Sequence, residues 1–186
     1  MSNTRTSLSH AQRLPTLFVS HGSPMFALEP GSTGPALQQL GRDLRAHHPQ
    51  LRGIVIMSPH WMSPFVEVMA HPAPATWHDF GGFPPALYQL QYPAPGSPAL
   101  AQEVADLLSA QGFGARLDPN RPRDHGAWVP LMHLFPQADI PVVQVALPQM
   151  ADAADVYAMG QALQSLREQG VFIVGSGSMT HNLREL

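Results

Sequence analysis

The apolar residues of this chain fall into two alternating patterns. Short apolar runs of strand length are separated by longer stretches in which apolar residues recur every three or four positions. The strand-like runs are residues 17–20, 53–57, 65–69, 140–147 and 171–174. The helix-like stretches are residues 34–48, 97–111 and 152–169, with a shorter one that begins at residue 124 or 126. This alternation predicts an α/β fold, with a central mixed, mostly parallel sheet flanked by helices.

Two parts of the chain lack either pattern. Residues 1–14 are polar, and we expect a flexible N-terminal segment there. Residues 71–95 are rich in proline, glycine and aromatic residues and show no regular period. Nothing in the remainder reads as a repeat or an interdomain linker, and 186 residues suit one domain with a substantial core. We therefore expect residues 15–186 to form a single α/β domain.

Three of the strand-like runs lead into a histidine, namely His21, His60 and His181. Ligands of open α/β sheets bind outside the carboxyl ends of the strands, so we expect the active site at that edge. Imidazoles from distant parts of a chain can converge there on one metal ion, and neutral imidazole suits zinc, iron, copper and nickel. Taken singly, His21 or His60 is better explained as a turn residue bonded to the backbone. Together, at two strand ends, they favour a metal site.

A fourth histidine, His125, follows a residue that can cap a helix, Asp124. At the first turn of a helix the macrodipole favours a neutral imidazole, which suits a hydrogen-bonding group in an active site. The alternative is a loop histidine without a function. His133, in an apolar helical segment, is expected to be a half-buried side chain with its hydrogen bonds satisfied rather than a ligand.

Composition excludes several classes of protein. The formal net charge is −3 and the charged residues form no basic stripe, which argues against a nucleic-acid partner. Cysteine is absent, so disulfides, thiolate metal sites and cysteine nucleophiles are excluded. The chain shows no glycine pattern typical of nucleotide binding, no apolar signal core and no run long enough to span a bilayer. We therefore expect a cytoplasmic protein that binds neither a nucleotide cofactor nor a membrane.

A family resemblance is carried by six motifs that occur in order over most of the chain. They are His-Gly-Ser-Pro-Met at 21–25, Ser-Pro-His-Trp at 58–61, His-Asp-Phe-Gly-Gly-Phe-Pro at 78–84, Tyr-Pro-Ala-Pro-Gly-Ser-Pro at 92–98, Asp-His-Gly-Ala-Trp at 124–128 and Gly-Ser-Met-Thr-His-Asn-Leu-Arg at 177–184. With these motifs the chain resembles the class III extradiol ring-cleavage dioxygenases, and within them the 4,5-DOPA dioxygenase-like branch.

The resemblance implies extradiol cleavage of a catechol such as L-DOPA by O2. It implies one divalent metal, Fe(II) for activity or Zn(II) as often found in this branch. His21 and His60 match the two histidine ligands of the family. His181 matches the general base beside the metal and, with zinc, a near-ligand. His125 matches a second active-site histidine, which acts as an acid or positions dioxygen.

The chain departs from the family pattern at its C-terminal end. The third metal ligand of the family lies in a later segment that has no counterpart in these 186 residues, so we expect a chain truncated relative to the family. His78 is a less favoured substitute for that ligand. Two rival functions follow, a zinc-dependent hydrolase and a non-catalytic zinc-binding protein of the same fold. Nothing in the pattern predicts the oligomeric state.

Overall fold

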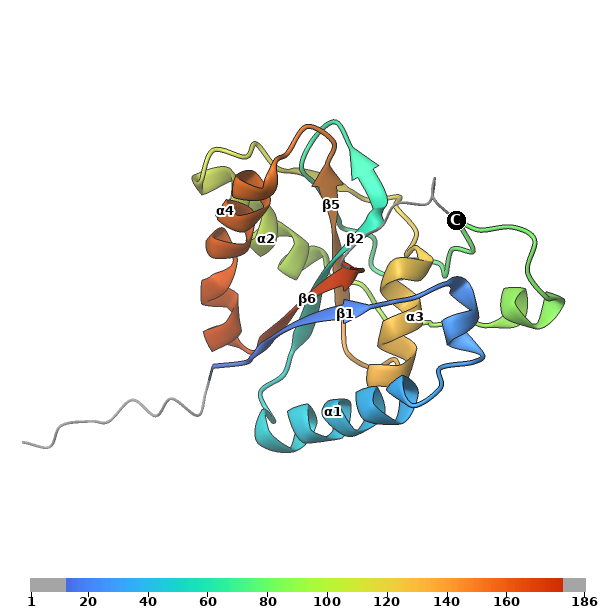
Figure 1. The fold of residues 1–186 in the computed structure, drawn as a ribbon. Coiled ribbons are helices and arrows are strands. Elements are labelled where there is room, and N and C mark those ends of the chain that lie inside the picture. The colour runs from blue at the N-terminus through green and yellow to red at the C-terminus, as the bar shows by residue number, and fades with distance from the viewer. Residues whose placement is uncertain (1–12, 179–186) are drawn as a thin grey trace, which may run out of the picture.

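A computed structural model describes residues 13–178, and these residues form one six-stranded sheet with the strand order β1-β6-β2-β5-β3-β4 (Figure 1). The strands are β1 (Thr16–Ser20), β2 (Gly53–Ser63), β3 (Glu67–Met69), β4 (Arg116–Asp118), β5 (Val142–Pro148) and β6 (Val171–Gly177). Neighbouring strands are parallel except β3 and β5, which are antiparallel. The predicted mixed, mostly parallel sheet is therefore confirmed.

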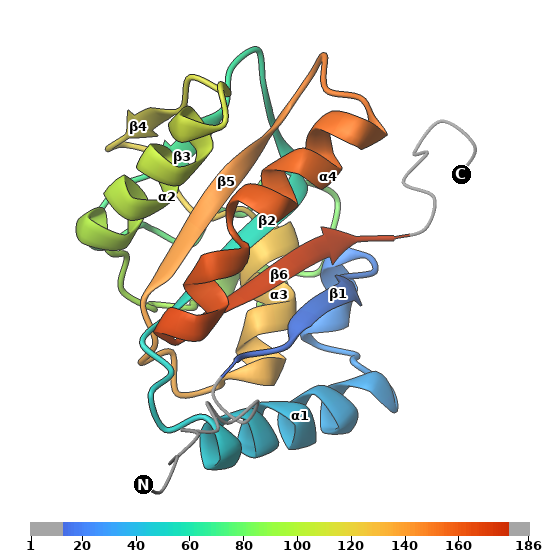
Figure 2. The same cartoon turned by 90° about the vertical axis from the view of Figure 1, so that its left-hand side faces the viewer.

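Helices cover both faces of the sheet, so the described part of the chain has three layers (Figures 1 and 2). The helices are α1 (Thr33–His47), α2 (Pro98–Ala110), α3 (His125–Leu134) and α4 (Ala153–Ala162), joined by the 3-10 turns η2 (Pro24–Ala27), η3 (Pro85–Gln89) and η4 (Gln164–Gln169). Ile54 and Ile56 of β2 pack into the core beneath α1 and α3, while Val55 between them packs beneath α2 and α4. A parallel strand buried on both faces must be apolar throughout, which explains the uninterrupted run in the sequence.

Two elements differ from the sequence-based expectation. The single helix expected over residues 152–169 is wrong, because α4 ends at Ala162 and the tighter turn η4 follows it. This change keeps Leu163 and Leu166, three positions apart, both buried against the sheet. The strand expected at residues 53–57 is longer, since β2 continues to Ser63 with a shift of register between Met57 and Met62.

Leu14 lies at the end of the segment expected to be flexible, and it is fully buried. Its backbone N–H donates to Arg167 O at 3.1 Å, and the guanidinium of Arg167 donates back to Leu14 O at 2.6 Å. Within residues 13–178 no helix is long and apolar enough to cross a membrane.

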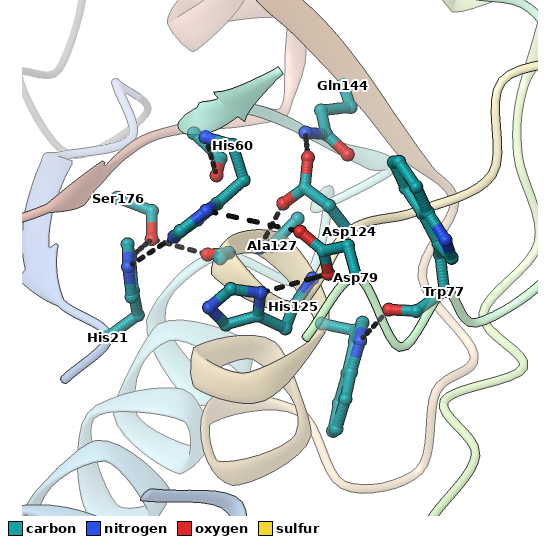
Figure 3. Close-up of polar contacts among 12 residues, drawn as sticks. His21, His60, Trp77, Asp79, Asp124, His125, Ala127, Gln144 and Ser176 are labelled. Atoms are coloured by element: carbon teal, nitrogen blue, oxygen red, sulfur yellow. Dashed lines mark hydrogen bonds and ion pairs between the residues drawn. The ribbon is translucent and has the colours of Figure 1, made fainter. Parts of the chain in front are cut away.

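The arrangement of β1, β6 and β2 defines the edge that carries the candidate site. β6 lies between β1 and β2 and is parallel to both, so the carboxyl ends of the three strands meet at one edge. Ser20 pairs with Gly177 and Met57 with Gly175, which places His21 and the continuation of β2 on either side of the end of β6. The N-terminus of α3 lies at the same edge (Figure 3).

Candidate metal centre

Three imidazoles converge at the carboxyl edge of the sheet (Figure 3). His21 follows β1, His60 lies in the continuation of β2, and His125 is the first residue of α3. One ring nitrogen of each lies within 4.8 Å of the others, which makes them the potential ligand group found in residues 13–178. The Nε2 atoms of His21 and His60 are 3.1 Å apart. Sequence reasoning named His21 and His60 as ligands and His125 as an acid or dioxygen-positioning residue, and the structure brings the three side chains together.

Ser176 of β6 fixes the tautomer of His21. The hydroxyl of Ser176 donates its single proton to the carbonyl of Gly126, which only accepts. The same hydroxyl lies 2.8 Å from His21 Nδ1, so it must accept a hydrogen bond from the N–H at that position. His21 therefore carries its proton on Nδ1 and presents a lone pair on Nε2 toward His60. Metal-bound histidines in proteins are oriented in this way by a partner on the second nitrogen.

His60 is positioned by the irregular part of β2. Its backbone N–H donates to Ser58 Oγ at 3.2 Å, and its side chain is 17% exposed. Gly126 of α3 passes close to both residues, because a Cβ on it would lie 2.2 Å from Ser58 Oγ and 2.8 Å from His60 Cδ2. Only glycine allows α3 to approach β2 at this point.

Asp124 caps α3 and joins the network around His60. Its side chain is fully buried, accepts from Ala127 N at 3.2 Å, and is hydrogen-bonded to Ser58 and to the amide of Gln144. Burial raises the pKa of Asp124 above its usual value, against the opposing effect of the bond from Gln144. The expectation that Asp124 caps this helix is confirmed.

His125 is held by Asp79, a residue of the long loop between β3 and α2. Asp79 Oδ1 lies 2.9 Å from His125 Nδ1 and accepts from the backbone N–H of His125 at 2.9 Å. Burial alone would raise the pKa of Asp79, but the hydrogen bonds from His125 hold it below its usual value. Asp79 Oδ2 is 4.0 Å from His60 Nδ1, so this carboxylate lies behind two of the three imidazoles.

The donor set fits one divalent metal ion. With Zn–N bonds of about 2.0–2.1 Å, two nitrogens of a tetrahedral zinc ion lie about 3.3 Å apart. The 3.1 Å between the Nε2 atoms of His21 and His60 is close to that value, and His125 is near enough to complete a three-nitrogen set. The negative charge of Asp79 beside the rings would offset part of the charge of the cation.

Other residues named from the sequence lie elsewhere. His181 lies outside the described residues. His78 is no substitute ligand, since its Nε2 is 3.0 Å from the carbonyl of Leu90 and its ring packs against Trp128, 5.6 Å between centroids. His133 is buried rather than half-buried, and its Nε2 lies 2.9 Å from Phe26 O, so it is hydrogen-bonded to the backbone as expected.

Sequence reasoning missed the partners of the histidines. Ser176, which the sequence analysis did not single out, lies inside β6 and holds His21. Asp79 stood in a recognised motif without an assigned role. The only signal in the sequence was that Asp79 follows His78 in a stretch without periodicity. Such a signal does not reveal which residue the carboxylate of Asp79 contacts.

The fold and the histidine cluster together define an α/β domain of the metal-binding type, with its site at the carboxyl edge of a mostly parallel sheet. Residues 15–186 match the family described as the catalytic LigB subunit of aromatic ring-opening dioxygenase. The chain belongs to this family.

Named relatives agree with the family. The chain is 44% identical over 181 residues to a "4,5-DOPA dioxygenase extradiol" of Escherichia coli K12, covering 92% of the chain and 62% of that protein. It is 42% identical over 167 residues to a protein of the same name from Beta vulgaris, covering 89% of the chain and 62% of the relative. The chain thus spans about three fifths of the length of these curated relatives.

A solved structure has the same fold. The crystal structure of an uncharacterized protein from Escherichia coli K12 superposes with a TM-score of 0.73 at 38% sequence identity. The match covers 92% of the chain and 63% of that protein.

Proposed function

We propose that the protein containing this chain cleaves the ring of a catechol next to the diol, using O2, with L-DOPA-like catechols as the first substrates to test. The observation that carries this proposal is the convergence of His21, His60 and His125 at the carboxyl edge of the sheet. The names of the relatives from Escherichia coli and Beta vulgaris support the reaction class. In this reaction one ring C–C bond breaks and both oxygen atoms enter the product.

In this proposal His21 and His60 hold the metal through Nε2. Fe(II) bound there would supply Lewis acidity and a path for electrons between the catechol and O2. His21 is 1% exposed, and Ser176 holds its ring in one orientation. Such a fixed, dry ligand holds its lone pair toward the site without reorganisation when the substrate binds.

His125 is proposed to handle a proton at the substrate. Asp79 occupies its Nδ1, which leaves Nε2 as the atom that donates to or accepts from a substrate oxygen. His181 is proposed as the base that removes a catechol proton, and this role rests on the family resemblance alone.

The catechol ring is proposed to lie along aromatic side chains next to His125. The ring of Phe80 meets that of His125 edge-on, with centroids 5.4 Å apart, and Phe83 and Tyr88 pack against Phe80 at 5.4 Å each. These rings favour a flat apolar substrate over an extended polar one. This aromatic wall supports the dioxygenase over the zinc hydrolase, whose substrate need not be flat.

The test is oxygen uptake by the full-length protein, loaded with Fe(II) under anaerobic conditions and mixed with L-DOPA and a panel of catechols. The expected result is one O2 consumed per catechol and a new yellow product. Isomers with a 1,3-diol should give no uptake, because their oxygens cannot both reach one metal ion. His60→Ala should lose metal and uptake together. His47→Ala, a change on the exposed face of α1, should alter neither.

Other outcomes would contradict the proposal. An Fe(II)-loaded protein that consumes no oxygen with any catechol is not a dioxygenase of this type. Ester or amide hydrolysis by the zinc form without O2 would establish the zinc hydrolase in its place. Tight zinc binding without turnover in either metal form would indicate a zinc-binding protein.

A further inference from the structure

The carboxylate of Asp79 makes an unusual double contact with one histidine. Its Oδ1 accepts from the backbone N–H of His125 and lies 2.9 Å from the Nδ1 of the same residue. The two residues are 46 positions apart in sequence, and the Asp79 side chain is 8% exposed. An ionised carboxylate only accepts hydrogen bonds, so the Nδ1 that faces it must carry the proton.

The loop that carries Asp79 is fixed on its N-terminal side. Arg123 N donates to Ala75 O at 2.9 Å, and Trp77 N donates to Arg123 O at 2.8 Å, so the loop runs beside the segment that leads into α3. The indole of Trp128, inside α3, donates to Trp77 O at 2.9 Å. Asp79, two residues further on, is therefore held against the start of the helix.

The same loop is fixed on its C-terminal side by a buried cation. The guanidinium of Arg123 is fully buried and donates to the carbonyls of Tyr92 and Ala94, at 3.1 Å each. Each end of the loop is thus tied to the residue two positions before His125. A carboxylate on such a segment can define the direction of an imidazole, because its own position is defined.

We propose that Asp79 is the positioning residue of His125. It fixes the Nδ1–H tautomer and the plane of the ring, so that Nε2 is the atom offered to the space between the imidazoles. Figure 3 shows the second nitrogen of His125 turned away from Asp79, on the side where His21 lies. This inference deepens the proposed function and rests on it only for its effect on turnover, since the tautomer is a property of the protein itself.

A merely structural role has to be separated from this one. A negative charge near the N-terminus of a helix stabilises that helix whether or not it touches a histidine. Asp155 of α4 provides a matched control, because its carboxylate accepts the backbone N–H of Asp152 at 3.1 Å at the start of that helix. Among the described residues, Asp155 belongs to no histidine cluster.

The experiment compares Asp79→Asn and Asp155→Asn in the full-length protein, in both the metal-free and the zinc-loaded form, because zinc bound to Nε2 of His125 would itself keep the proton on Nδ1. Long-range ¹H–¹⁵N correlations of the imidazoles report which nitrogen carries the proton, with the His125 signals assigned through His125→Ala. The wild type and Asp155→Asn should show Nδ1–H at His125. Asp79→Asn should show a mixture or the opposite tautomer, because an amide can also present N–H to the ring. In the Fe(II) form, Asp79→Asn should lower kcat about 10–100-fold and change KM little.

Two results would overturn the inference. A wild-type His125 that carries its proton on Nε2 contradicts it directly, whether or not any variant folds. An Asp79→Asn protein with the wild-type tautomer and only the stability loss of Asp155→Asn assigns Asp79 a structural role. If the wild type shows no oxygen uptake, the dioxygenase proposal fails while the tautomer measurement still decides the role of Asp79.

Discussion

His21 and His125 belong to the same histidine cluster, but they are held by chemically different partners. His21 Nδ1 lies 2.8 Å from the neutral hydroxyl of Ser176, which is itself bonded to a backbone carbonyl. His125 Nδ1 lies 2.9 Å from the carboxylate of Asp79. Both kinds of partner can orient a metal-bound imidazole, but only the carboxylate also stabilises an imidazolium, which suits a ring that handles a proton. The partners are therefore consistent with the two proposed roles.

Gly126 connects the two sides of this comparison. Its carbonyl accepts the Ser176 proton that fixes His21, and its Cα lies against Ser58 and His60. It also follows His125 directly in α3. A change at this one position is expected to disturb all three imidazoles at once.

The largest effect is expected from Gly126→Ala. Alanine improves helix propensity by about 1 kcal/mol, but overpacking of this kind costs about 1–3 kcal/mol and displaces His60. Zinc affinity should fall toward the upper end of the roughly 10–100-fold range typical for disturbed ligand partners. Competition with a chromophoric chelator measures the affinity, and urea unfolding measures the stability.

Gly160→Ala is the matched control for that prediction. Gly160 also lies in a helix, but a Cβ on it would meet nothing within 4 Å. This variant should gain up to about 1 kcal/mol of stability and keep wild-type zinc affinity. Equal zinc affinities for Gly126→Ala and Gly160→Ala would mean that the close approach of α3 to β2 does not position His60.

An intermediate effect is expected from Ser176→Ala, which removes only the neutral partner. His21 Nδ1–H would lose its acceptor inside a buried site, at a cost of about 1–3 kcal/mol in stability. Zinc affinity should fall about tenfold, because the ring is freed to rotate or to change tautomer. The tautomer of His125 should stay unchanged, and the imidazole correlations can verify this.

Ser32→Ala serves as the comparison for Ser176→Ala, since Ser32 precedes α1, is exposed and makes no capping hydrogen bond. It should behave as the wild type in both assays. If Ser176→Ala shifted the His125 signals as strongly as Asp79→Asn does, Ser176 and Asp79 would not act on separate histidines. The contrast between His21 and His125 would then be wrong.

The smallest effect on zinc affinity is expected from Ser58→Ala. Ser58 Oγ accepts the backbone N–H of His60 at 3.2 Å, a contact to the main chain rather than to the ring, and Ser58 is also hydrogen-bonded to the buried carboxylate of Asp124. The loss of both bonds should cost about 1–3 kcal/mol in stability but lower zinc affinity by less than Ser176→Ala does. A larger loss of affinity than that of Ser176→Ala would show that the irregular part of β2 matters more than the orientation of His21.

The fold could be predicted largely from local pattern. The apolar runs of β5 and β6 and the amphipathic spacing of α1 and α2 follow directly from burial on one or both faces. The change from α4 to η4 could not be foreseen, because Leu163 and Leu166 fit either a continuous helix or a tighter turn. Tertiary packing decides between them.

The sequence allowed us to place site residues that lie at the ends of predicted strands. It did not allow us to place site residues in stretches without a regular apolar pattern. His21 and His60 were found because strand ends share one edge of a parallel sheet. Asp79 could not be placed, since its position depends on contacts of a long loop with Arg123. The shift of register after Met57 that brings His60 inward also leaves no mark in the apolar pattern.

The position of β6 between β1 and β2 has a consequence for how the protein is made. The two strands that carry His21 and His60 pair with β6 and not with each other, and Ser176 is 155 positions after His21. A ribosome adds about 5–20 residues per second, so roughly 8–30 s separate the synthesis of the first histidine from that of its partner. During this interval β1 and β2 have unpaired edges, which chaperones recognise and which favour aggregation. We therefore expect any metal loading at this site to follow the synthesis of β6, because only then are the strands that carry His21 and His60 held side by side.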